Sequence, residues 1–183
     1  GLTFTAISEP ADGWSLVWGA ELYLDEVDSA RRRLNEETGE ESEVRSRFPD
    51  GSSMDSAAIY ANLSWPVTDR LTLDAGLRYS RFDITLTETT ESPGADLSPD
   101  DFTGDLRAVF ALTDSLSIVG NLGRGFRPPN IFDLGTLGPR PGNRFNVANP
   151  DLGPETVWSY DLGIKAMVGN WQLEAFAWYM DYK

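Results

Sequence analysis

The sequence contains no cysteine and no histidine. Without cysteine it can form no disulfide and no thiolate metal site. Without histidine it has neither the commonest general base nor the commonest transition-metal ligand. It also has no apolar run near the roughly 20 residues that a membrane-spanning helix needs, which excludes a helical membrane protein. We therefore predict that the chain is not an enzyme and has no catalytic residue, metal site or cofactor.

Positive charge is also scarce. The chain carries 15 Lys and Arg against 29 Asp and Glu, for a net charge of −14. Nucleic-acid binding needs clustered basic residues, so the composition excludes nucleic acid as a partner. Charges of both signs crowd residues 25–51, which indicates a solvated loop. Contact with divalent cations or lipopolysaccharide is the alternative for this segment.

The dominant pattern is period-two alternation, which is typical of β-strands. From residue 71, one face carries Leu71, Leu73, Ala75, Leu77 and Tyr79, and the other carries Thr72, Asp74, Gly76, Arg78 and Ser80. We predict eight strands, at about 2–8, 14–25, 57–65, 71–80, 102–110, 116–124, 158–168 and 171–182. Between Tyr79 and Ile84 the apolar set moves from odd to even positions. This shift predicts either a bulge or a strand that leaves an apolar zone.

The connections between these strands alternate in length. Tight turns rich in Gly, Pro, Asn and Asp lie near residues 9–13, 66–70, 113–115 and 169–170, whereas segments 26–52, 85–101 and 125–155 are long and polar. Short turns on one side and long loops on the other are typical of outer-membrane barrels, as are aromatic residues at strand ends. The aromatic residues in question are Trp14, Trp65, Tyr79, Trp158, Trp171 and Tyr179. The predicted fold is all-β, an antiparallel transmembrane β-barrel of which this chain supplies about eight strands.

The opposite faces of these strands carry charges of both signs. They are Glu21, Asp74, Arg78, Asp105, Arg107, Asp161 and Lys165. Charged side chains inside a barrel need water or partners, and a wide barrel that holds water and a plug supplies both. About eight strands cannot close so wide a barrel, so the chain is expected to be a segment of a larger one.

Several motifs in order resemble one family. The strand Leu73–Tyr79 is followed by Gly125-Phe126-Arg127-Pro128-Pro129, then by Asn149-Pro150-Asp151-Leu152-Gly153-Pro154-Glu155 and Tyr160-Asp161-Leu162-Gly163-Ile164-Lys165. Over residues 55–183 the chain resembles the barrel of TonB-dependent outer-membrane receptors. Pro128 stands where the family usually has Ala, and Asp161 stands where it usually has Glu.

The resemblance implies a 22-stranded barrel with an N-terminal plug that imports scarce nutrients with energy passed from TonB. Residues 1–183 would then be a segment of the barrel domain in the bacterial outer membrane, without the plug. The implied partners are outer-membrane lipids and lipopolysaccharide, the TonB complex and a small-molecule chelate. The cargo is expected to be an iron-siderophore chelate. Haem is disfavoured because residues 130–148 lack the His that haem receptors of the family carry there.

The motif residues invite two interpretations. Pro128, Pro129, Asn149, Pro150 and Pro154 are expected to shape the loop ends, because proline cannot donate to a strand ladder. Arg127, Asp151 and Glu155 could form an ion pair at the edge of the lumen or touch the ligand.

Arginines between the two loop motifs suggest an anion-binding site. Arg140 and Arg144, with Phe145 beside them, are suited to carboxylate, phosphate or hydroxamate oxygens. The alternative is that they neutralise the acidic segment 25–51 or bind lipopolysaccharide phosphate. For the whole chain, the alternatives are a complete eight-stranded outer-membrane barrel with a structural or adhesive role, and a soluble β-sandwich that binds carbohydrate.

Overall fold

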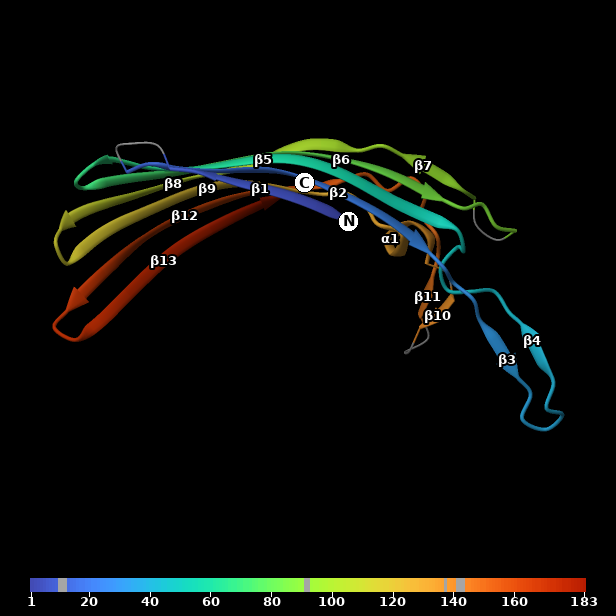
Figure 1. Ribbon diagram of the computed structural model, residues 1–183. Helices are drawn as coiled ribbons and strands as arrows, with labels where there is room; N and C mark the ends of the chain where they lie inside the picture. The colour runs from blue at the N-terminus through green and yellow to red at the C-terminus, as the bar shows by residue number, and fades with distance from the viewer. Residues whose placement is uncertain (10–12, 91–92, 137, 141–143) are drawn as a thin grey trace.

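Eight long antiparallel strands form one curved sheet. The structure is a computed structural model that describes residues 1–183 except 10–12, 91–92, 137 and 141–143. In sheet order the long strands are β1 (Leu2–Ser8), β2 (Ser15–Val27), β5 (Ser52–Thr68), β6 (Leu71–Leu86), β8 (Asp100–Thr113), β9 (Leu116–Arg127), β12 (Glu155–Val168) and β13 (Trp171–Tyr182). The eight predicted strands and the antiparallel all-β fold are confirmed. In Figure 1 the sheet is an arc, with α1 and the β10–β11 hairpin under its concave side.

The long connections contain short elements that the sequence did not predict. They are the hairpin of β3 (Arg32–Leu34) and β4 (Glu41–Glu43), the strand β7 (Ala95–Leu97) beside β6, the helix α1 (Ile131–Gly135), and the hairpin of β10 (Gly138–Arg140) and β11 (Arg144–Asn146). Three-residue strands are too short to show alternation. No helix in the described part of the chain is long and apolar enough to cross a membrane.

The sheet is open at both sides. Its order begins at β1 and ends at β13, and no ladder joins those two strands among the described residues. A complete eight-stranded barrel is therefore not what this chain forms. A β-sandwich would need a second sheet packed on the first, whereas the two further sheets described here are small hairpins. The arc is part of the wall of a larger barrel.

The turns and the long loops lie at opposite ends of the strands. Two-residue turns at 69–70, 114–115 and 169–170 join β5 to β6, β8 to β9, and β12 to β13 at one end (Figure 1). Gly169 has φ +59°, a left-handed conformation that glycine adopts without the steric cost that a side chain would add. The connections 28–51, 87–99 and 128–154 lie at the other end, as the alternating lengths predicted.

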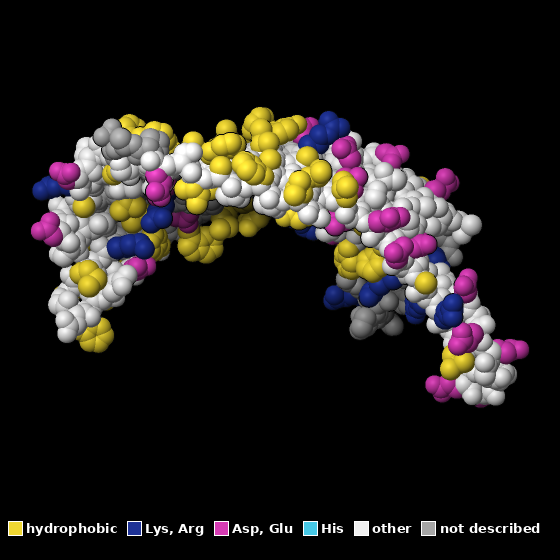
Figure 2. All heavy atoms as spheres, in the orientation of Figure 1, with side chains coloured by type: hydrophobic (Ala, Val, Ile, Leu, Met, Phe, Trp, Pro, Cys, Tyr) yellow, Lys and Arg dark blue, Asp and Glu magenta, His cyan; other side chains and the backbone are white. Residues whose placement is uncertain are grey.

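The convex face is apolar in its middle. Figure 2 shows hydrophobic side chains gathered over that face, while acidic and basic side chains gather toward the long-loop end. Ile59, Leu77 and Leu162 are 62%, 58% and 63% exposed. The outward residues of β6 run from Leu71 to Tyr79. Eight steps of about 3.4 Å on a strand tilted by about 40° give a band roughly 21 Å tall, close to the roughly 25 Å band of outer-membrane barrels.

The parity shift in β6 is not a bulge. The β5–β6 register is unbroken from Ser53 opposite Thr85 to Pro66 opposite Thr72, and the shifts in the sheet lie beside the turns at 66–68 and 111–113. Outward positions after Tyr79 become charged, with Arg81 and Asp83. Inward positions become apolar, with Phe82, Ile84 and Leu86. The strand leaves the apolar zone, which was the second of the two predictions.

The inward apolar positions form a small core with α1. Ile84, Leu86, Ile131 and Leu134 are between 0% and 7% exposed. Val27, Met54, Phe82, Ala95, Leu97 and Leu152 pack around them. The helix therefore lies inside the arc, where it covers the inner face of the wall at its long-loop end.

Six of the seven charged residues predicted for the concave face have a polar partner, and Asp105 has none among the described residues. Arg78 and Glu21 lie 2.6 Å apart, Arg107 and Asp74 lie 4.0 Å apart, and Lys165 and Glu174 lie 3.2 Å apart. The Asp161 carboxylate accepts a hydrogen bond of 3.0 Å from the side-chain amide of Asn121. These contacts fit the expected polar lumen, and the surface beside them contains an open hollow of about 740 Å³.

A seam interrupts the wall between β8 and β9. Their ladder stops at Gly104 opposite Arg124, although β8 begins at Asp100 and β9 runs to Arg127. At the seam the Phe102 amide donates to Asp101 Oδ1 at 2.7 Å, and the Phe102 carbonyl accepts from Arg124 Nη1. Asp101 and Arg124 are themselves ion-paired at 2.6 Å. Side chains here satisfy backbone groups that a neighbouring strand satisfies elsewhere.

Candidate functional site

The end of β9 turns directly into helix α1. Strand β9 ends at Arg127 because the next two residues, Pro128 and Pro129, have no backbone N–H to continue the ladder. Asn130 is the N-cap of the helix, and its side chain accepts a hydrogen bond of 2.9 Å from the Asp133 amide. The Asp133 carboxylate accepts in return from the Asn130 amide at 3.4 Å. This capping box fixes the Asp133 side chain at the start of the helix, at the long-loop end of the sheet.

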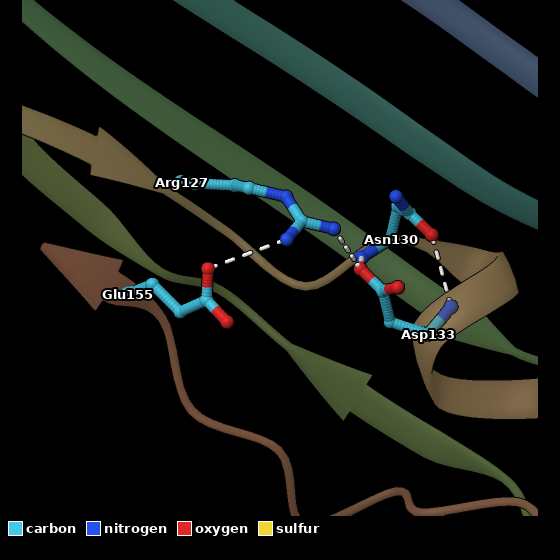
Figure 3. Close-up of polar contacts among 4 residues, drawn as sticks. All are labelled: Arg127, Asn130, Asp133 and Glu155. Carbon is cyan, nitrogen blue, oxygen red and sulfur yellow. Dashed lines mark hydrogen bonds and ion pairs between the residues drawn. The ribbon is translucent and has the colours of Figure 1, made fainter. Parts of the chain in front are cut away.

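Arg127 joins the helix to the next strand. Its guanidinium lies 2.6 Å from Asp133 Oδ2 and 3.3 Å from Glu155 Oε2, the first residue of β12 (Figure 3). The Arg127 and Glu155 backbones are also paired across the β9–β12 ladder. Both motifs therefore meet at one guanidinium. Asp151 forms no ion pair with the part of the chain that the structure describes.

The remaining motif residues shape the loop ends. Gly125 and Phe126 pair with Val157 and Thr156 across the β9–β12 ladder. The Asn149 amide donates to the Leu134 carbonyl at 2.8 Å, so the second motif is tied to the helix. Pro150 and Asp151 form a turn, Leu152 packs against the small core, and Pro154 immediately precedes β12.

An open hollow of about 390 Å³ lies beside Arg127. This volume is within the range of small-molecule sites, roughly 300–1,000 Å³. Its apolar lining comes from Pro128, Pro129, Phe132, Phe145, Val147 and Leu152, and its polar lining from Arg127, Asp133, Thr136, Asn146 and Glu155, with Gly153. Thr136 is 3% exposed, and its Oγ1 atom has no hydrogen-bond partner among the described residues. A buried hydroxyl of this kind is ready to bond to a group that enters the hollow.

The predicted ligand residues fall on two sides of the β10–β11 hairpin. Phe145 lines the hollow and is 63% exposed. Its neighbour Arg144 is exposed and is not among the residues that line the hollow. Arg140 is opposite Arg144 in the hairpin register, and its side chain lies outside the described part of the chain. The Arg140–Arg144 ligand site remains a prediction.

Sequence reasoning missed the helical side of the site. Phe132, Asp133 and Thr136 line the hollow but were not singled out. The spacing Asn130-x-x-Asp133 is a capping-box pattern and could have indicated a helix start. Nothing in the sequence indicated that Thr136 would be buried.

The sequence matches a known protein family over nearly its whole length. The family described as TonB dependent receptor-like, beta-barrel, matches residues 2–183. The chain belongs to that family. A relative, the rhizobactin receptor of Rhizobium meliloti (strain 1021), is 22% identical over 212 residues, which cover 98% of this chain and 28% of the receptor. This TonB-dependent receptor segment thus spans less than a third of the length of that relative.

Solved structures show the same fold. The copper transporter OprC superposes with a TM-score of 0.74 at 20% identity, over 96% of this chain and 28% of the transporter. The Serratia marcescens hemophore receptor HasR gives a TM-score of 0.68 at 19% identity, over 98% of this chain and 32% of the receptor. The FrpB iron transporter from Neisseria meningitidis gives a TM-score of 0.66 at 14% identity, over 99% of this chain and 27% of the transporter. The open arc is therefore a partial TonB-dependent receptor barrel.

Proposed function

We propose that this chain is part of the wall of an outer-membrane receptor that imports a scarce nutrient in a TonB-dependent manner, and that its cargo is an iron-siderophore chelate. The convex apolar band would face outer-membrane lipids, and the concave hollow beside Arg78 and Asp105 would face a plug supplied by another part of the protein. The long loops, with lipopolysaccharide around them, would lie outside the cell. The iron transporter, the copper transporter and the hemophore receptor that share this fold support uptake, and the rhizobactin receptor supports a siderophore.

One observation carries the choice of an anionic chelate. The β10–β11 ladder places residues 140 and 144, both arginines, directly opposite each other at the long-loop end. Like charges at opposite positions of a hairpin repel each other. A bound anion would offset that repulsion, and arginine binds carboxylate, phosphate and hydroxamate oxygens well. Phe145 extends from the same hairpin into the hollow, where it could contact the cargo.

The test is the double variant Arg140→Ala/Arg144→Ala of the whole receptor. We expect weaker binding of the cognate ferric chelate, by roughly 1.5–3 kcal/mol for each charge-assisted hydrogen bond lost, or at least about tenfold. Uptake of radiolabelled iron chelate by whole cells and affinity of the purified receptor are the measurements. The matched control is Arg31→Ala/Arg33→Ala, which removes two positive charges at the β3–β4 hairpin, away from the hollow. Equal affinities in the two double variants would contradict the site.

The proposed orientation in the membrane can be tested separately by labelling. The chain has no cysteine, so single cysteines can be introduced without a background in this segment. A membrane-impermeant maleimide should modify Thr38→Cys, in the turn between β3 and β4, on intact cells. It should not reach Asp69→Cys or Asp114→Cys, in the short turns. Both classes should react after the cells are lysed. Equal labelling on intact cells would contradict the orientation.

A further inference from the structure

The hollow beside α1 differs in charge from the arginine hairpin next to it. Its described lining includes one basic side chain, Arg127, and two acidic ones, Asp133 and Glu155. Arg127 bonds both carboxylates, through Asp133 Oδ2 and Glu155 Oε2. The described lining therefore has a net charge of about −1, and its guanidinium already bonds two carboxylates. An anionic group entering here would meet the negative charges of Asp133 and Glu155 beside Arg127.

Unused acceptor atoms remain at the same place. Asp133 Oδ1 and Glu155 Oε1 have no hydrogen-bond donor among the described residues, and Figure 3 shows both carboxylates beside the Arg127 guanidinium. An ionised carboxylate can only accept hydrogen bonds. A ligand group that binds to these free oxygens would therefore donate hydrogen bonds to them.

Thr136 also indicates a binding site, independently of the two carboxylates. Thr136 is one of the residues that line the hollow and is 3% exposed, and its Oγ1 atom has no hydrogen-bond partner in the part of the chain that the structure describes. A buried hydroxyl without a partner destabilises the folded state, so such groups are uncommon unless something else satisfies them. Threonine can accept a hydrogen bond from an incoming donor as well as give one.

The remaining walls suit a cation with an apolar stem. Phe132 and Phe145 border the hollow, as do Val147 and Leu152. Aromatic faces attract ammonium groups, and more strongly when water is excluded.

We propose that this hollow binds an ammonium group carried on an aryl or alkyl arm, with Thr136 Oγ1 and the free oxygens of Asp133 and Glu155 as its acceptors. The inference rests on the proposed import function only in assigning that arm to the cargo. The arginine hairpin and the hollow would then recognise opposite ends of one ligand, its anionic chelating end and its cationic arm.

The test uses two probes that differ at one end. The purified whole receptor in detergent is titrated with 2-phenylethylammonium or with 3-phenylpropionate, followed by saturation-transfer NMR. We expect the ammonium probe to bind at least tenfold more tightly. Equal binding, tighter binding of the carboxylate, or no binding of either probe would overturn the proposal.

Two variants connect that binding to the named atoms. Thr136→Val keeps the shape of the side chain and removes its hydroxyl, so the affinity for the ammonium probe should fall about 3- to 10-fold, as for one lost hydrogen bond. The same change should raise the melting temperature of the receptor without probe, because an unsatisfied hydroxyl disappears. A raised melting temperature with unchanged affinity would mean that Thr136 is structural only, and would overturn its role as a ligand.

Glu155→Gln reports on charge. It should reduce the preference for 2-phenylethylammonium over the neutral 2-phenylethanol, and an unchanged preference would count against the carboxylate. Thr38→Val, far from the hollow, is the control for a threonine replaced in a long loop. Cellular uptake of the ferric chelate is measured in parallel on the unmodified receptor. Absence of uptake with intact probe binding would contradict the import function alone, and uptake without probe binding would contradict this site alone.

Discussion

Replacement of Leu77 by arginine should prevent or severely weaken assembly of the barrel. Leu77 lies in the middle of the convex face and is 58% exposed in this chain. On the surface of a soluble protein, such a change is usually worth less than about 0.5 kcal/mol. On the lipid face of an outer-membrane barrel, an arginine near the midplane costs about 2–4 kcal/mol. The measurement is the free energy of folding of the whole receptor into lipid vesicles.

The control for that variant is Thr103→Arg. Thr103 borders the hollow of the concave face, where Arg78 and Arg124 already lie among polar partners. We expect Thr103→Arg to fold with a free energy within about 1 kcal/mol of the parent, since lumen positions of wide barrels tolerate charge. If the two variants cost the same free energy, the assignment of convex to lipid and concave to lumen would be wrong.

Truncation of Leu134 to alanine should release the loop that follows β9. The Leu134 side chain is 0% exposed and packs with Ile84 and Leu86, so the change leaves a cavity in a small core. Leucine-to-alanine changes in cores cost about 2–5 kcal/mol. This core has four buried members in the described chain, and a loss of that size should undock α1 rather than unfold the wall. Amide hydrogen exchange across 128–154 should rise while exchange in β9 and β12 stays unchanged.

Val147→Ala is the matched control for the helix. Val147 lies in the same connection but is 74% exposed, so its truncation removes few contacts. Exchange in 128–154 should then remain at the parent level. Faster exchange in β9 or β12 of the Leu134→Ala variant would show that α1 supports the wall itself, contrary to the expectation.

The long strands were predictable because successive side chains of each strand point to opposite faces of the sheet, one apolar and one polar. In β6 the residues between Leu71 and Tyr79 alternate between the apolar convex face and the polar concave face of the sheet. Beyond Tyr79 the pattern left two alternatives open, a bulge or a strand that leaves the apolar zone, and the second is what the structure has. Ile84 and Leu86 are apolar because α1 covers them, and a partner that arrives some 45 residues later in the chain leaves no local signal.

The site was predictable only in its strand-end residues. Arg127 and Glu155 belong to motifs and lie opposite each other in adjacent strands, so pairing follows from the ladder. Asp133 lies within a five-residue helix that folds inward after the strand, and Thr136 follows that helix directly, so both residues reach the same hollow. A helix that short has little intrinsic stability, and it forms here because Ile131 and Leu134 are buried by tertiary contacts.

The seam between β8 and β9 makes one part of the wall depend on residue identity. Along the rest of the β8–β9 pair, from Gly104 to Thr113, strands are joined by backbone hydrogen bonds that every residue except proline can supply. Beside Phe102, the join is made by the Asp101 carboxylate and the Arg124 guanidinium. Substitutions elsewhere in the ladder can change the lining of the wall and keep it continuous. At the seam, the contact between β8 and β9 depends on the side chains of Asp101 and Arg124, which must be kept or exchanged together.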